Sequence, residues 1–144
     1  MNPSEIFCQI RKKWVAALPE EIIRQRLLRH MIEELGYPPQ VIAVEKSLSQ
    51  IPHLAGMKLP LRRADILCFG PTIHPLLVIE CKAVPLAPKA LRQLVGYNFY
   101  LKSSYIALAN ETELKCGWYN VAKKDYHFID HLLPYHRMIH PRTE

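Results

Sequence analysis

Three charged residues lie inside two otherwise apolar segments of the chain. Asp65 occurs in "RADILCF", and Glu80 and Lys82 occur in "LLVIECKA". A buried charge is costly unless it is paired or binds a metal, so these side chains require either partners or a chemical role. Residues two apart on a strand project to the same face, which places Glu80 and Lys82 together and turns Cys81 to the opposite face.

The segment "GPTIHP" between the two runs predicts a turn that closes an antiparallel hairpin. The expected register pairs residues of the two strands as follows: Phe69 with Leu76, Leu67 with Val78, and Asp65 with Glu80. Directly opposed side chains have Cβ atoms roughly 4.5–5.5 Å apart, and two carboxylates at that separation repel unless a cation lies between them. The register therefore predicts a divalent metal between Asp65 and Glu80, whereas a slip of one residue would separate the two acids.

A metal at this position would allow these residues to catalyse hydrolysis. Carboxylate oxygens are the ligands that Mg²⁺ takes, usually one or two per site with waters, and such an ion can activate water for attack on a phosphodiester. A neighbouring lysine can orient that water, neutralise the transition state or act as a base, and the sequence leaves these roles open for Lys82. The alternative is that Glu80 and Lys82 lie on a solvated strand face and that Asp65 caps a turn.

The first element that must position these residues is a helix in "LPEEIIRQRLLRHMIEELGYPP". Pro19 suits a first helical position, and Glu20 and Glu21 face the positive end of the helix dipole. Gly36, followed by two prolines, predicts the end of the helix.

The other elements follow from runs of apolar and β-branched residues. Strands are expected at 41–48, 62–69, 76–83 and 104–110, a second helix at 89–102, and one more strand at 116–122, whereas 49–60 is expected to be a loop or short hairpin and the tail from 125 has no assignment. The order α-β-β-β-α-β predicts an α/β (α+β) fold, with a mixed central sheet flanked by helices. A single domain over 1–144 is expected, with its core at about 19–121 and peripheral terminal segments.

Charge and composition narrow the class of partner. The net charge of +6 and a pI near 9.2 favour an anionic partner such as nucleic acid. No apolar run reaches the roughly 18–20 residues of a membrane span, and the first residues lack the apolar core of a secretory signal. The four cysteines are scattered without a CxxC pair, which argues against zinc and favours a reduced, cytoplasmic protein without a membrane partner.

Four segments in this order resemble a known family: "PEEIIRQ", "RRADIL", "LLVIECKA" and "RQLVGYNFYL". Asp65 and the Glu80-Cys81-Lys82 triplet resemble the signature of the PD-(D/E)XK nuclease superfamily. Together the four segments resemble the N-terminal nuclease domain of type I restriction enzyme R subunits, from about Pro19 to Asn110. The resemblance implies a restriction-endonuclease-like fold.

The resemblance also implies roles for individual residues. Asp65 and Glu80 would hold Mg²⁺, with Mn²⁺ as the alternative ion, and Lys82 would assist the attacking water. An acid on the first helix often completes such a site, and Glu21 is favoured over Glu20 for this position. The other reading of both glutamates is a favourable interaction with the helix dipole.

Further residues would support the site or touch DNA. Gln93 and Tyr97 match the Gln-x-x-x-Tyr element of the family, and at i and i+4 they project from one helical face. Without the resemblance they would be interpreted as a polar stripe on an amphipathic helix. Arg62 and Arg63 precede Asp65 and are candidates for the same supporting or DNA-binding role.

The sequence departs from the family pattern in two ways. The first motif reads Ala64-Asp65 instead of Pro-Asp, and the chain has no GxxxxGK[ST] loop, so ATP-driven translocation is not expected within it. The leading hypothesis is a metal-dependent DNA endonuclease, as a homodimer or with a separate motor or specificity subunit. The alternative is a non-catalytic nucleic-acid-binding or subunit-interaction module of the same fold.

Overall fold

The computed structural model describes residues 4–58 and 63–141 of the 144-residue chain. Within these ranges the strands and helices run in the order β1 (Glu5–Cys8), β2 (Lys13–Ala16), α1 (Pro19–Glu33), β3 (Ile42–Ser47), β4 (Arg63–Phe69), β5 (Pro75–Cys81), α2 (Pro88–Leu101), β6 (Tyr105–Ala109), β7 (Leu114–Asn120), β8 (Asp125–Ile129) and α3 (Tyr135–Ile139). Three short 3₁₀ turns lie at Pro39–Val41, Leu48–Gln50 and Pro52–Leu54.

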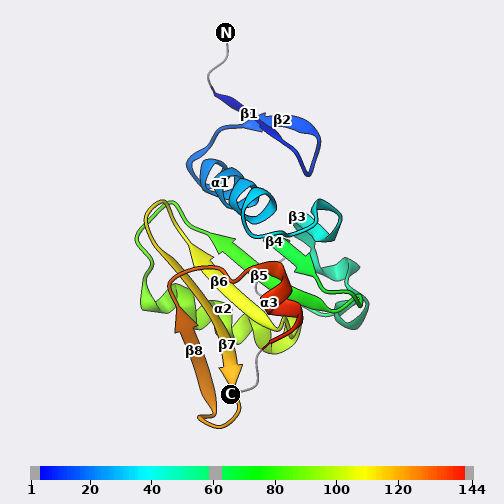
Figure 1. Cartoon of the computed structure of the whole chain (residues 1–144), viewed down its shortest axis with the longest axis vertical. Coiled ribbons are helices and arrows are strands. Elements are labelled where there is room, and N and C mark those ends of the chain that lie inside the picture. The colour runs from blue at the N-terminus through cyan, green and yellow to red at the C-terminus, as the bar shows by residue number, and fades with distance from the viewer. Residues whose placement is uncertain (1–3, 59–62, 142–144) are drawn as a thin grey trace.

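The central element is a six-stranded sheet with the order β3-β4-β5-β6-β7-β8. β5 and β6 are parallel, and every other neighbouring pair is antiparallel. β1 and β2 form a separate two-stranded hairpin beyond α1 (Figure 1). This arrangement confirms the predicted mixed α/β class.

Helices cover both faces of the six-stranded sheet (Figure 1). On one face α1 and α3 pack against the sheet, and the buried core residues there include Leu28, Met31, Ile66, Ile79 and Met138. On the other face α2 packs against the sheet, and the buried residues there include Leu67, Val78, Leu94, Tyr97 and Leu101. Because both faces of β5 are covered, six of its seven residues are buried.

The predicted ends of the first helix are confirmed by local geometry. α1 begins at Pro19, whose fixed φ suits the first helical position, and the two following glutamates lie in the first turn. The chain leaves the helix through Gly36 at φ +74, a conformation that glycine adopts without steric cost. The N–H of Tyr37 donates to the carbonyl of Met31 at 3.0 Å, and this contact satisfies one carbonyl that the helix end would leave free.

A side-chain clamp joins the end of α2 to the start of β6. Lys102 follows α2 in the left-handed region at φ +58. The Asn98 carboxamide accepts from the N–H of Ser103 at 2.8 Å and donates to the Ser103 carbonyl at 3.0 Å. These buried hydrogen bonds fix the turn that returns the chain to the sheet beside β5.

The expected hairpin between β4 and β5 exists, and its register is confirmed at Leu67, which pairs with Val78. The predicted pairing of Phe69 with Leu76 is wrong, because Phe69 pairs with Pro75 after an irregularity between Cys68 and Phe69. β5 is apolar and buried on both faces, so the hydrophobic pattern does not penalise a shift at this end of the strand.

Several elements were not assigned from the sequence. The N-terminal hairpin, β8 and α3 lie in segments expected to be peripheral, and the last predicted strand is β7, which begins two residues earlier than expected. The expected strand at 76–83 ends at Cys81, which leaves Lys82 just beyond β5. Among the helices of the described chain, none is both long and apolar enough to cross a membrane.

Candidate active site

Asp65 lies near the start of β4, and both of its carboxylate oxygens have protein partners. Oδ2 accepts the backbone N–H of Cys81 at 2.7 Å, and Oδ1 accepts from the Arg24 guanidinium at 3.1 Å. The first contact places the Asp65 carboxylate directly beside the peptide that joins Glu80 to Cys81. β4 and β5 therefore bring two of the three predicted catalytic residues to the same end of their hairpin.

Glu80 and Lys82 form an ion pair at this end, with Oε1 and Nζ 3.1 Å apart. Both side chains are partly buried, with exposed fractions of 15% for Glu80 and 31% for Lys82. The backbone N–H of Lys82 donates to the carbonyl of Ala109 at 2.8 Å, which holds Lys82 against β6 although β5 has ended. The predicted common face of Glu80 and Lys82 is thus confirmed by their contact.

The first-helix acid predicted to complete the site, Glu21, is buried among cations. Its Oε1 lies 2.6 Å from Arg11 and 3.0 Å from Arg24, and its Oε2 accepts from the Gln25 carboxamide at 3.0 Å. Burial raises the pKa of the Glu21 carboxyl, but the hydrogen bonds from Arg11 and Gln25 and the charges of both arginines outweigh it. The pKa of Glu21 consequently lies below its usual value.

A third acid, Glu45 of β3, approaches the same two arginines. Its backbone is in the left-handed region at φ +53, a rare and strained conformation for a non-glycine residue in a strand. Its carboxylate lies 3.5 Å from Arg24 and 3.6 Å from Arg11. The strained residue joins the acid–arginine cluster, which comprises Arg11, Glu21, Arg24, Glu45 and Asp65.

The structure explains without a metal how β4 and β5 tolerate the charges of Asp65 and Glu80. The sequence hypothesis invoked a metal to neutralise Asp65 and Glu80, whereas the structure provides Arg24 for Asp65 and Lys82 for Glu80. Within the described residues, no group of three or more His, Cys, Asp or Glu side chains is arranged to hold a metal ion. Metal binding stays a prediction.

The three acids predicted to bind a metal differ in how many hydrogen bonds their carboxylates already accept. Asp65 and Glu80 offer hard carboxylate oxygens from adjacent strands, and a carboxylate that accepts two hydrogen bonds retains further lone pairs. Glu21 accepts three hydrogen bonds, from Arg11, Arg24 and Gln25, so it has fewer free lone pairs for a metal than Asp65, which accepts two. Asp65 and Glu80 stay the predicted metal ligands.

The other predicted site residues differ in how far they are buried. Gln93 is exposed on α2, whereas Tyr97 one turn later is buried at 4% exposure. Burial raises the pKa of the Tyr97 hydroxyl, and the charge of Glu80 acts in the same direction, so Tyr97 lies near the candidate site. Glu20 and Arg63 are exposed, and the prediction for Arg62 falls outside the described residues.

Sequence reasoning missed three members of the acid–arginine cluster. Arg24 carries a weak signal, since it lies three residues after Glu21 on one helix and such pairs meet. Arg11 belongs to the loop of the N-terminal hairpin, and Glu45 depends on an unusual backbone angle. Neither feature is visible in the spacing of residue types.

Comparison with known proteins gives one family. No curated protein matches the chain. The family described as "Type I restriction enzyme R protein N terminus" matches residues 19–134, a range that begins with α1 and includes β3 to β8, Asp65, Glu80 and Lys82. This range covers most of the chain and exceeds the segment over which the sequence resemblance was seen. The chain therefore belongs to the family of type I restriction enzyme R protein N-termini.

Proposed function

We propose that the chain is a metal-dependent DNA endonuclease that hydrolyses phosphodiester bonds at Asp65, Glu80 and Lys82. The observation that carries the proposal is the hydrogen bond from the Cys81 N–H to Asp65, which places that carboxylate beside the Glu80–Cys81 peptide. Family membership supports a restriction-related, nuclease-like role. Asp65 on β4, Glu80 on β5 and Lys82 just after β5 also resemble the signature of the PD-(D/E)XK superfamily.

Each of the three side chains has a defined part in the proposed mechanism. Asp65 and Glu80 would hold a Mg²⁺ or Mn²⁺ ion, which supplies an acidified water and neutralises charge on the phosphodiester. The Cys81 N–H and Arg24 orient the Asp65 carboxylate. Lys82, through Nζ, holds Glu80 in place and presents a positive charge to the scissile phosphate.

The partners proposed for the chain follow from its charge and family. The net charge of +6 favours association with the DNA backbone. Because the family is named for one protein of a type I restriction enzyme, a separate motor or specificity subunit is proposed as a partner, with a homodimer as the alternative. Sedimentation of the chain alone and with DNA distinguishes a self-associating form from a monomer.

The acid–arginine cluster favours a second candidate function. Arg11 and Arg24 already neutralise Glu21, and Arg24 also pairs with Asp65. A module that binds nucleic acid or another subunit without cutting can keep its acids paired in this way. Such a module would bind DNA equally well with and without divalent cations. Cleavage would be absent.

The deciding experiment measures metal binding and plasmid cleavage on the same samples. The variants are Asp65→Asn, Glu80→Gln and Lys82→Met, and the matched control is Glu111→Gln, whose side chain is 74% exposed. We expect calorimetry to show Mg²⁺ or Mn²⁺ binding that both acid variants abolish. Each of the three variants should lower the cleavage rate by at least about 100-fold, whereas the control should cut like the unmodified chain.

Two outcomes would contradict the nuclease proposal. One is unchanged cleavage in Glu80→Gln, which would place the chemistry elsewhere or assign it to a contaminant. The other is DNA binding by the unmodified chain without metal binding or cutting, which would leave the non-catalytic module. Thermal unfolding of every variant shows whether a loss of activity comes from a loss of folding.

A further inference from the structure

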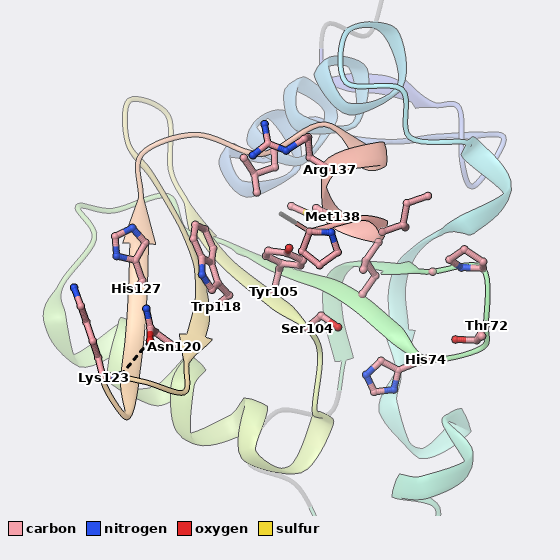
Figure 2. A pocket seen from close by; sticks show the side chains of 16 residues that line it. Thr72, His74, Ser104, Tyr105, Trp118, Asn120, Lys123, His127, Arg137 and Met138 are labelled. Carbon is pink, nitrogen blue, oxygen red and sulfur yellow. Dashed lines mark hydrogen bonds between the residues drawn. The ribbon is translucent and has the colours of Figure 1, made fainter. Parts of the chain in front are cut away.

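A concave site lies at the opposite end of β5 from Glu80. It has a volume of about 810 Å³ and is lined by the β4–β5 turn, the start of β6, the β7–β8 hairpin and α3. Figure 2 shows side chains from these elements facing a common space, with Trp118 and His127 on one side and His74 and Thr72 on the other. The volume lies within the range typical of small-molecule sites. We refer to it as the hairpin pocket.

The charges around the hairpin pocket have one sign. Lys123 of the β7–β8 turn and Arg137 of α3 line it together with His74 and His127, and among the described lining residues none is Asp or Glu. The Arg137 Nε is buried and has no hydrogen-bond partner among the described residues. A buried donor without a partner carries a desolvation cost that an anionic ligand would remove.

One wall of the hairpin pocket is a row of three rings from adjacent strands. Trp118 of β7 lies between Tyr105 of β6, at a ring-centroid distance of 5.8 Å, and His127 of β8, at 5.1 Å. Trp118 and His127 are directly paired across β7 and β8. Trp118 is only partly buried, so part of the ring row is available to a ligand, and aromatic side chains of this kind stack nucleobases in many sites.

The cations lie close to the ring row. The charge of Arg137 acts on the Tyr105 hydroxyl, where it opposes the rise in pKa that burial causes. Lys123 lies next to the row in the β7–β8 turn (Figure 2), and its backbone N–H donates to the Asn120 side chain at 3.1 Å. An aromatic wall with adjoining cations can contact both a planar ring and an anion attached to it.

From this combination we propose that the hairpin pocket binds one nucleotide unit, with the base against the Tyr105–Trp118–His127 row. The phosphate would lie at one end of the row, near Lys123 on the His127 side or near Arg137 on the Tyr105 side (Figure 2). The ligand can be a free nucleotide or an unpaired nucleotide of a DNA strand, since both carry the same base and phosphate. A bare anion would leave the aromatic wall without a role, and an apolar ligand would leave the cations without one. The proposal does not depend on cleavage at Asp65 and Glu80.

The test uses the fluorescence of Trp118. The chain has two tryptophans, and Trp14 is 64% exposed on the N-terminal hairpin, so Trp14→Phe leaves Trp118 as the single reporter. The full chain is titrated in EDTA with a deoxynucleoside monophosphate, with a short oligodeoxynucleotide, with an abasic strand of the same length, and with inorganic phosphate. We expect saturable quenching by the nucleotide or by the oligodeoxynucleotide, and none by the abasic strand or phosphate.

Charge variants test the phosphate contact. One of Lys123→Gln and Arg137→Gln should weaken binding by about 10-fold, as expected for loss of a charge-assisted hydrogen bond, and the one that does so identifies the end of the ring row that holds the phosphate. The matched control is Lys124→Gln, which removes the same charge from the same turn at a residue that does not line the pocket, and it should leave binding unchanged. Glu80→Gln should also bind normally, which separates this site from the proposed nuclease site.

The titrations support or overturn the proposal directly. Quenching by both the monophosphate and the strand supports a site for free nucleotides, and quenching by the strand alone supports a site for an unpaired nucleotide. Absence of quenching by either ligand overturns the proposal, even if every charge variant unfolds. Equal quenching by the abasic strand, or equal weakening by Lys123→Gln and Lys124→Gln, overturns it in favour of non-specific attraction to a basic surface.

Discussion

Replacing Arg24 by methionine should destabilise the chain far more than the same change elsewhere on α1. The guanidinium makes close contacts with Glu21 at 3.0 Å and Asp65 at 3.1 Å and a longer contact with Glu45 at 3.5 Å. A hydrogen bond to a charged group contributes roughly 1.5–3 kcal/mol when buried. We assign about 2 kcal/mol to the contact with Glu21, and about 1 kcal/mol to Asp65, which is 30% exposed.

The expected loss in the free energy of unfolding is therefore about 3 kcal/mol, the lower end of the range for breaking a buried ion pair. The contact with Glu45 adds little, because that side chain is 44% exposed and its charge is screened by solvent. Arg11 and Gln25 remain on Glu21, which limits the loss. Methionine preserves the length of the side chain and hence much of its packing.

The matched control is Arg26→Met on the same helix. Arg26 is 64% exposed and lies 3.9 Å from Glu111, itself 74% exposed, so its loss should cost less than about 0.5 kcal/mol. Both variants are compared with the unmodified chain by urea unfolding followed by circular dichroism. If both substitutions lower the free energy of unfolding by the same amount, burial does not make the ion pairs of the acid–arginine cluster stronger than an exposed pair.

The loss of stability in Arg24→Met should depend on pH, and the direction follows from the pKa of Glu21. Because the pKa of Glu21 is lowered in the folded chain, its ion pairs contribute stability above its ordinary value near 4.5 and lose it as the pH falls through the lowered pKa. The difference between Arg24→Met and the unmodified chain should therefore be largest at neutral pH and shrink in acid. A constant difference across this range would show that the loss comes from packing instead of charge.

Two further substitutions test local features of the fold. Gly117→Ala should destabilise the chain by about 1–3 kcal/mol in urea unfolding, because an added Cβ would lie 2.9 Å from the carbonyl oxygen of His127 and closer still to the Phe128 ring; a neutral result would mean that the β7–β8 pairing relaxes freely. Tyr97→Phe should be neutral or stabilise by up to about 1 kcal/mol, since the buried hydroxyl has no hydrogen-bond partner among the described residues. A clear loss of stability in Tyr97→Phe would contradict the absence of a partner, whereas a selective loss of cleavage would assign the hydroxyl to the substrate.

The sequence predicts those parts of the fold that depend on local patterns. The ends of α1 follow from Pro19 and Gly36, and the pairing of Leu67 with Val78 follows from the position of the "GPTIHP" turn between β4 and β5. The N-terminal hairpin was not predicted because its turn has Lys12 at φ +55 where glycine or asparagine would signal a turn. β8 was not assigned because it is only five residues long and none of its residues is fully buried, as is common for a strand at the edge of a sheet.

The candidate site was predictable only in part. Asp65, Glu80 and Lys82 stand out because charge interrupts apolar strands, and the structure brings them to one end of the β4–β5 hairpin. The contact between Arg24 and Asp65 spans 41 positions in the sequence, and it depends on where α1 lies relative to the sheet. No local pattern specifies that distance, so the partners that neutralise the buried charge could not be inferred from residue spacing.

The N-terminal hairpin contributes a positive charge, that of Arg11, to residues that lie within the family match. That match begins at residue 19, whereas Arg11, which contacts Glu21 and Glu45, precedes it. With Arg11 the acid–arginine cluster has three carboxylates and two guanidiniums and so a charge of −1, and without Arg11 the charge becomes −2. If a divalent cation binds at this end of the sheet as proposed, a chain trimmed to the family boundary should differ in its ion affinity although Asp65 and Glu80 are untouched.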